Sequence, residues 1–300
     1  MAGPNIAPLQ ELESLELVHE TGPEHDGVRL HYVSVGRGPL VVLLHGFPEY
    51  WGGWHAQIAR LVDAGFRVVA PDLRGYGQSD KPEPVEAYYL ERLADDVGAL
   101  LAHLDAGPAV VVGHDWGGAV AWMHAMRHPA QVKRLAILNM PHPAVFAAAW
   151  STFRQKLKSF YFYFFRMRTI AAFMFRRFRA FGQRFMLYFF SRRAAKWRTF
   201  DHYGDEGLRP GAMKAMMSWY TALLARDPDT MVQLVRPLRL PILVLWGDED
   251  PAFGEKLADP GDHVDRDRLE VRYLRGAGHF IHLERADEVS EALAEFARDG

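Results

Sequence analysis

The chain has 300 residues, of which 49% are hydrophobic and 24% are charged, and its formal net charge is -2 at pH 7. This composition is typical of one large globular domain, with or without an insertion, and the small net charge gives no reason to expect a nucleic-acid partner. The lack of cysteine excludes disulfides, thiolate metal sites and a cysteine nucleophile. With neither a signal-like N-terminus nor a run of about 18 apolar residues, we expect a cytoplasmic protein without a transmembrane segment.

Strand patterns alternate with helical patterns along most of the chain. Short apolar or alternating runs predict strands, and apolar residues at helical spacing predict helices. The predicted strands are residues 28–35, 40–44, 67–72, 109–112, 132–138, 242–246 and 269–274. The predicted helices are residues 90–104, 118–128 and 287–296. This alternation predicts an α/β fold with a mostly parallel central sheet flanked by helices.

Residues 142–230 interrupt the alternation, because they are rich in helix formers and lack the punctuation of strands and turns. We interpret them as a helical cap inserted into a core domain of residues 1–141 and 231–300. Residues 150–200 contain 13 Lys or Arg, 18 aromatic residues and no Asp or Glu, which leaves 22 basic and 37 acidic residues elsewhere. Weak contact of this segment with a membrane surface is one hypothesis. The alternative is an ordinary amphipathic cap whose cations face solvent or the acidic core.

The segment Gly113-His114-Asp115-Trp116-Gly117-Gly118 follows a β-branched run and precedes a helical pattern. This is the frame of a nucleophile elbow, with aspartate in the position of the nucleophile. A carboxylate is suited to displacement at saturated carbon, where the product is an ordinary ester. The alternative reading is an aspartate that caps the following helix.

Two further segments contain the partners that such a nucleophile needs, in the order nucleophile, acid, histidine. Asp250 follows one late strand and His279 follows the last strand, so all three groups can meet at the carboxyl edge of the sheet. Spacing alone leaves Asp248 as an alternative to Asp250. The backbone N–H groups of Phe47 and Trp116 are the predicted oxyanion hole, and Pro48 is a candidate for a cis peptide bond.

Four motifs together resemble the α/β-hydrolase-fold epoxide hydrolase family, whose relatives include haloalkane and fluoroacetate dehalogenases. They are His45-Gly46-Phe47-Pro48-Glu49, the segment from Asp72 to Pro82, the elbow and Gly278-His279-Phe280. The resemblance implies an α/β-hydrolase fold with a cap, a covalent ester on Asp115, and two cap tyrosines that bind the epoxide oxygen. Tyr220 matches the second tyrosine. Tyr161 matches the first, Tyr163 competes with it, and Arg166 stands where the family often has glutamine.

The expected reaction opens a lipophilic epoxide to a vicinal diol and needs no cofactor and no metal. Asp115 attacks, Tyr161 and Tyr220 assist the oxygen, and water activated by His279 and Asp250 hydrolyses the ester. A dehalogenase with the same nucleophile is the main alternative, because the indole of Trp116 could bind a halide. A non-catalytic binding protein of the same fold is the third hypothesis. The sequence leaves the natural substrate, the selectivity and the oligomeric state open.

Overall fold

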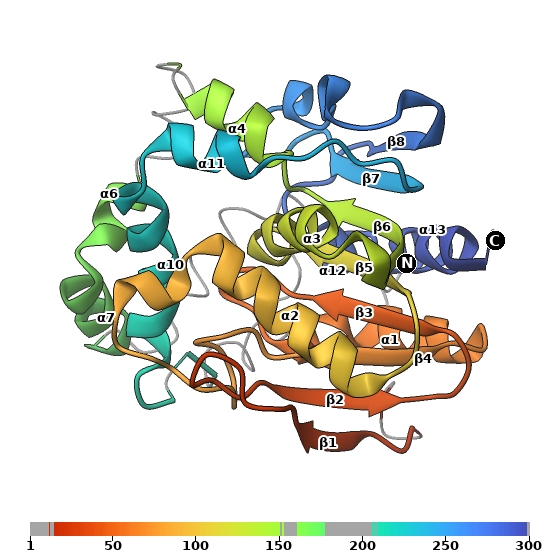
Figure 1. Cartoon of the computed structure of the whole chain (residues 1–300), viewed down its shortest axis with the longest axis horizontal. Coiled ribbons are helices and arrows are strands. Elements are labelled where there is room, and N and C mark those ends of the chain that lie inside the picture. The colour runs from red at the N-terminus through yellow and green to blue at the C-terminus, as the bar shows by residue number, and fades with distance from the viewer. Residues whose placement is uncertain are drawn as a thin grey trace, which may run out of the picture.

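In the computed structural model, the described residues are Leu12, Thr152 and the ranges 15–150, 161–177, 206–207 and 209–298. They form one eight-stranded sheet in the order β1-β2-β4-β3-β5-β6-β7-β8 (Figure 1). The strands are β1 (Val18–Thr21), β2 (His31–Val35), β3 (Leu40–Leu44), β4 (Arg67–Pro71), β5 (Ala109–His114), β6 (Val132–Leu138), β7 (Ile242–Gly247) and β8 (Leu269–Leu274). The pairings β1–β2 and β2–β4 are antiparallel and all others are parallel.

The predicted mostly parallel sheet is confirmed, and its buried strands explain why the sequence shows continuous apolar runs. In β5, Val111 packs in the core on one face of the sheet, whereas Val110 and Val112 pack in the core on the other face. A strand covered on both faces needs apolar side chains at every position. The prediction for residues 28–35 was too long, because β2 begins at His31 and Val28 forms an isolated bridge with His25.

Helices cover both faces of the sheet (Figure 1). On one face α2 (Leu90–Leu104) packs against α3 (Trp116–Arg127), and on the other α1 (His55–Asp63) packs against α13 (Ala286–Arg298). The short α12 (Ile281–Glu284) precedes α13. Among the described residues, 3₁₀ helices occupy Trp51–Trp54, Val85–Tyr88, Pro129–Gln131, Glu255–Leu257, Gly261–His263 and Arg266–Arg268.

Between β6 and β7 the chain forms α4 (Pro143–Trp150), α6 (Tyr161–Arg166), α7 (Arg168–Arg177), α10 (Ala212–Ala225) and α11 (Pro228–Leu234). In Figure 1, α6, α7 and α10 lie beyond the edge at which the parallel strands end. This is the edge where open α/β sheets bind ligands. The predicted cap limit at residue 230 falls inside α11, so the domain boundaries stay a prediction. Within the described residues, no helix is long and apolar enough to span a membrane.

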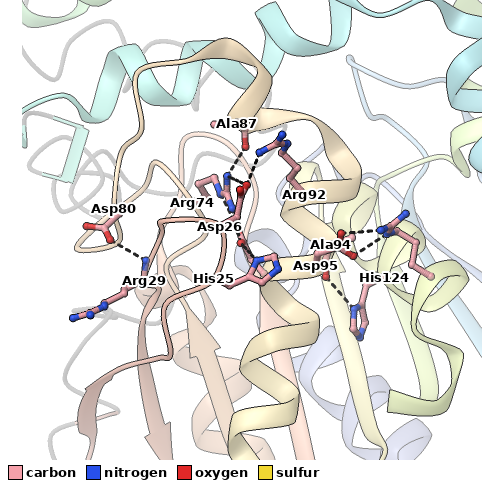
Figure 2. A network of polar contacts seen from close by, with 12 residues as sticks. His25, Asp26, Arg29, Arg74, Asp80, Ala87, Arg92, Ala94, Asp95 and His124 are labelled. Carbon is pink, nitrogen blue, oxygen red and sulfur yellow. Dashed lines mark hydrogen bonds and ion pairs between the residues drawn. The ribbon is translucent and has the colours of Figure 1, made fainter.

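A buried polar network holds the loop after β4 beneath these helices (Figure 2). The guanidinium of Arg74 donates to both carboxylate oxygens of Asp96, at 2.8 and 2.6 Å, and to the carbonyl of Ala87 at 2.8 Å. Burial opposes the charge, but the bonds to Asp96 raise the pKa of Arg74 above its ordinary value. The carbonyl of Arg74 in turn accepts a 3.0 Å hydrogen bond from the indole of Trp219 in α10. The loop after β4 therefore links α10 to the core through hydrogen bonds.

Candidate active site

The turn between β5 and α3 exposes one carboxylate at the carboxyl edge of the sheet. Asp115 has φ 49° and ψ −124°, a left-handed conformation that costs a non-glycine residue about 1–3 kcal/mol. Small neighbours make the turn possible, because a Cβ on Gly113 would lie 2.4 Å from the carbonyl oxygen of Gly117. The strain and the close approach are typical of a nucleophile elbow rather than of a simple helix cap.

Both oxygens of the Asp115 carboxylate have a partner from another segment. Oδ1 accepts a 2.9 Å hydrogen bond from the backbone N–H of Phe47, and Oδ2 lies 3.2 Å from Nε2 of His279. The Phe47–Pro48 peptide is cis, which confirms that prediction. Of the two predicted oxyanion donors, only Phe47 bonds to this carboxylate among the described residues. Trp116 directly follows Asp115 in the chain and is the first residue of α3.

Asp250, and not Asp248, meets the histidine. Its Oδ2 lies 2.8 Å from Nδ1 of His279 and accepts a 2.6 Å bond from the amide of Asn139. Its Oδ1 accepts bonds from two backbone N–H groups in the turn that follows β7. Asp248 is exposed and accepts a bond from the N–H of Gly276. The structure thus brings together three of the predicted residues, Asp115, His279 and Asp250.

The charges of this triad stabilise one another although all three groups are buried. Burial alone would lower the pKa of His279, but the negative charge of Asp250 and the hydrogen bonds with Asp115 and Asp250 raise that pKa well above its ordinary value. Burial would raise the pKa of Asp250, but the charge of His279 and the bonds to it lower that pKa below its ordinary value. The resting site therefore holds a histidinium between two carboxylates.

A second buried cluster behind the triad was not recognised from the sequence. The carboxylate of Glu49 lies 2.7 Å from Nδ1 of His114 and 2.8 Å from Nε2 of His282, and it accepts a 2.9 Å bond from the N–H of Gly46. All three side chains are at most 1% exposed, so Glu49 does not face a substrate. One carboxylate thus joins the Phe47 loop, the elbow and the segment after His279.

The contacts of this cluster hold Glu49 in its ionised form. Nε2 of His114 lies 3.0 Å from the carbonyl oxygen of His279, so both ring nitrogens of His114 contact oxygen atoms. Burial opposes ionisation of Glu49, but the electrostatic interactions and hydrogen bonds with His282 and His114 hold the pKa of Glu49 well below its ordinary value. The donor atoms of these three residues are close enough to hold a metal ion. The nitrogen atoms that would bind a metal, however, are those that bond Glu49.

An apolar cavity of about 260 Å³ opens above Asp115. Its wall includes Trp116 and Tyr220, whose rings meet edge to face at 5.2 Å, and Tyr220 is only 3% exposed. Tyr163 also lines the cavity and is half exposed. The backbone of Tyr161 begins α6, but its side chain lies outside the described part of the structure. The remaining lining residues are Leu90, Ala119, Met140, Pro141, Pro143, Phe146, Ala147, Trp150, Phe162, Arg166, Leu223, Leu224, Arg226, Met231 and Phe253.

Comparison with known proteins identifies the family. A family model described as alpha/beta hydrolase fold matches residues 39–286. The AB hydrolase superfamily protein YfhM of Bacillus subtilis (strain 168) is 37% identical over 290 residues, which cover 91% of this chain and 96% of that protein. Epoxide hydrolase 4 of Mus musculus is 33% identical over 282 residues, which cover 91% of this chain and 77% of that protein. The Bacillus megaterium epoxide hydrolase, solved with an inhibitor, superimposes with a TM-score of 0.80 at 28% identity. The match covers 92% of this chain and 99% of that one. The chain therefore belongs to the α/β-hydrolase fold family, in the branch that contains the epoxide hydrolases.

Proposed function

We propose that this protein is an epoxide hydrolase that converts a lipophilic epoxide to a vicinal diol without a cofactor. The observation that carries the proposal is a carboxylate, Asp115, at the position of the nucleophile, bonded by the N–H of Phe47 and facing His279 below an apolar cavity. Relatives named epoxide hydrolase in mouse and in Bacillus megaterium support the same reaction.

In the first step, Oδ2 of Asp115 forms a bond to an epoxide carbon while the carbon–oxygen bond of the ring breaks. The released oxygen is a strong base and takes a proton from a tyrosine as it forms. Tyr220 is our first candidate, since its ring contacts both Trp116 and Phe47 beside the nucleophile. Tyr161 is the second candidate and Tyr163 the alternative to it. The product of this step is an ester between Asp115 and the alcohol.

In the second step, His279 removes a proton from water, which adds to the ester carbonyl. Alkylation makes Asp115 neutral, so His279 loses one of the two carboxylates that raise its pKa. Its Nε2 proton then passes to the tyrosinate left by the first step, and the neutral imidazole becomes a base. The N–H of Phe47 already contacts Oδ1, the oxygen that becomes the oxyanion, and the N–H of Trp116 joins it. The intermediate collapses to the carboxyl group, and the diol oxygen takes the proton from His279. The second proton of the water, which remains on the carboxyl group of Asp115, returns to His279 and restores the resting histidinium and carboxylate.

Three other functions fit fewer of these contacts. A haloalkane dehalogenase would share Asp115 and would use indole N–H groups such as that of Trp116 for the halide, but it would need no tyrosine beside the nucleophile. A fluoroacetate dehalogenase would need arginine where this chain has Trp116. A binding protein would have no use for a histidinium held between two buried carboxylates, which costs desolvation energy.

Parallel assays with styrene oxide and 1-bromobutane distinguish these functions. The proposal predicts formation of the diol from styrene oxide and no release of bromide. Bromide release alone would identify a dehalogenase, and no reaction with either compound would favour a binding protein. The Asp115→Ala variant should be inactive, and turnover by a folded Asp115→Ala protein would refute the mechanism.

We also propose that residues 142–230 act as the cap over this site, and a cytoplasmic location remains a prediction. If the cap contacts a membrane surface, α6 and α7 are the candidates. The described large apolar side chains that are exposed in and between these helices are Tyr163, Phe164, Met167, Ile170, Phe173 and Met174. Sedimentation with liposomes that contain phosphatidylglycerol tests this contact at low salt. Protein that stays in the supernatant would end the hypothesis.

A further inference from the structure

The proposed reaction does not use Arg166, although this residue lines the cavity that holds the nucleophile. Arg166 is the last residue of α6, and its side chain is exposed. It therefore lies where the apolar cavity meets solvent. A cation in such a place affects which substrates enter and how they are oriented.

Arg166 differs from the other charged residues of the cavity wall, Asp115 and Arg226, because it has no counter-charge in the described part of the chain. Asp115 faces His279 at 3.2 Å. Arg226 donates two hydrogen bonds to the carboxylate of Glu91, and its guanidinium lies 4.1 Å from the ring centre of Tyr89. Within the described residues, no carboxylate lies within ion-pair distance of Arg166.

The sequence around Arg166 is positively charged. Residues 150–200 contain 13 Lys or Arg and no acidic residue, so no neighbour in the sequence neutralises Arg166. Arg168 donates to the carbonyl of Glu83 and to the hydroxyl of Ser218, and the carboxylate of Glu83 pairs with Lys214, so these charged groups together remain positive. The mouth of an otherwise apolar cavity therefore has a field that attracts anions.

We propose that the natural substrate is an amphiphilic epoxide with a carboxylate, and that Arg166 binds this carboxylate. The epoxide ring would lie at Asp115 and the hydrocarbon part along the apolar wall. A guanidinium suits this role, because it stays charged and can donate two parallel hydrogen bonds to a carboxylate. This inference rests on the proposed function and adds the substrate class to it.

The test compares matched probes that differ only in charge. The ω-epoxy carboxylates from 5,6-epoxyhexanoate to 10,11-epoxyundecanoate are assayed against the corresponding amides, with styrene oxide as a neutral reference. We expect the carboxylate of the best length to exceed its amide by about tenfold in kcat/KM, chiefly through KM, since a charge-assisted bond at a solvated rim has about this strength. Added NaCl should reduce the preference, because the pair is exposed.

Variants assign the preference to one residue. Arg166→Gln should reduce the ratio of kcat/KM for the carboxylate to kcat/KM for the amide to about one, whereas Arg166→Lys should retain part of the preference. Arg37→Gln is the control, because Arg37 is an exposed arginine in the turn between β2 and β3, at the opposite edge of the sheet. It makes the same change in net charge and should keep the full preference.

Four outcomes would overturn the inference. The inference would be refuted if wild-type protein had the same kcat/KM for the amide and the carboxylate at every length. It would also be refuted if the protein hydrolysed only styrene oxide. Both results would leave the proposed function intact. A carboxylate preference that survives in Arg166→Gln would refute the role of this residue. Failure to hydrolyse any epoxide would instead refute the proposed function, and the inference with it.

Discussion

The substitution Asp250→Asn tests whether the acid of the triad is correctly assigned. The carboxylate of Asp250 accepts four hydrogen bonds: from His279 and Asn139 on Oδ2, and from the N–H groups of Ala252 and Phe253 on Oδ1. Asparagine has the same shape but only one oxygen. If that oxygen keeps the two backbone bonds, the amide nitrogen faces two donors.

This conflict predicts which step becomes slow. His279 can relieve its part of the conflict by moving the proton from Nδ1 to Nε2, but it then cannot accept a proton from water. The same exchange in a serine protease triad lowers kcat by about 10⁴ through the wrong tautomer, and we expect a loss of about 10³–10⁴ here. The amide of Asn139 loses its acceptor, which costs about 1–3 kcal/mol of folding free energy. Attack by Asp115 needs no base, so the first step should persist.

Rapid-quench kinetics with mass spectrometry of the intact protein separates the two steps. Asp250→Asn should accumulate protein that is heavier by one substrate, while wild-type protein turns over. Asp248→Asn is the matched control, because Asp248 is exposed and should leave both steps unchanged. The assignment would be mistaken if Asp250→Asn hydrolysed the ester at the wild-type rate. It would also be mistaken if Asp248→Asn accumulated the ester.

Three further substitutions test other parts of the molecule. Tyr220→Phe removes only a hydroxyl and should slow alkylation by about 10²-fold with styrene oxide in stopped-flow assays, and an unchanged rate would exclude Tyr220 as proton donor. Glu49→Ala leaves the buried rings of His114 and His282 without the carboxylate that they contact and should lower the free energy of unfolding in urea by about 1–3 kcal/mol for each ring, more than Glu49→Gln does, whereas wild-type stability would contradict the stabilising role of this cluster. Burial lowers the pKa of His124 from 6.5 to about 4, so below pH 6.5 the unfolded chain binds a proton that the folded protein does not bind. Stability from this histidine is lost as the pH falls from about 6.5 to about 4, by about 2 kcal/mol at pH 5. The loss of unfolding free energy between pH 7 and pH 5 should be smaller by that amount in His124→Gln, and equal losses would contradict the reasoning.

The parts of the fold that the sequence predicts best are those that are most buried. Strand β3 and helix α2 have the predicted bounds, because continuous burial and an amphipathic face leave clear patterns in the sequence. Strand β1 was not predicted, since its residues Val18–Thr21 are all exposed and show no alternation. Its position comes from pairing with β2, a tertiary interaction that no local pattern records.

The same distinction holds for the candidate site. Asp115, Asp250 and His279 each follow a strand, so the topology of a parallel sheet is sufficient to predict that they meet. The contact between Glu49 and His114 could not be predicted, because these residues are 65 positions apart and no sequence motif relates them. Only the folded chain shows that their side chains meet. The cap tyrosines lie on helices whose orientation depends on packing, which the sequence does not specify.

The central claim is that Asp115 forms an ester that water then hydrolyses, and the origin of the diol oxygen tests it most directly. A single turnover in H₂¹⁸O, with enzyme in excess over epoxide, separates the two possible routes. The ester route predicts that the first diol contains no ¹⁸O and that the label enters the peptide with Asp115, because water attacks the carboxyl carbon. A labelled first diol together with an unlabelled Asp115 peptide would mean that water opens the epoxide directly, and it would contradict this account.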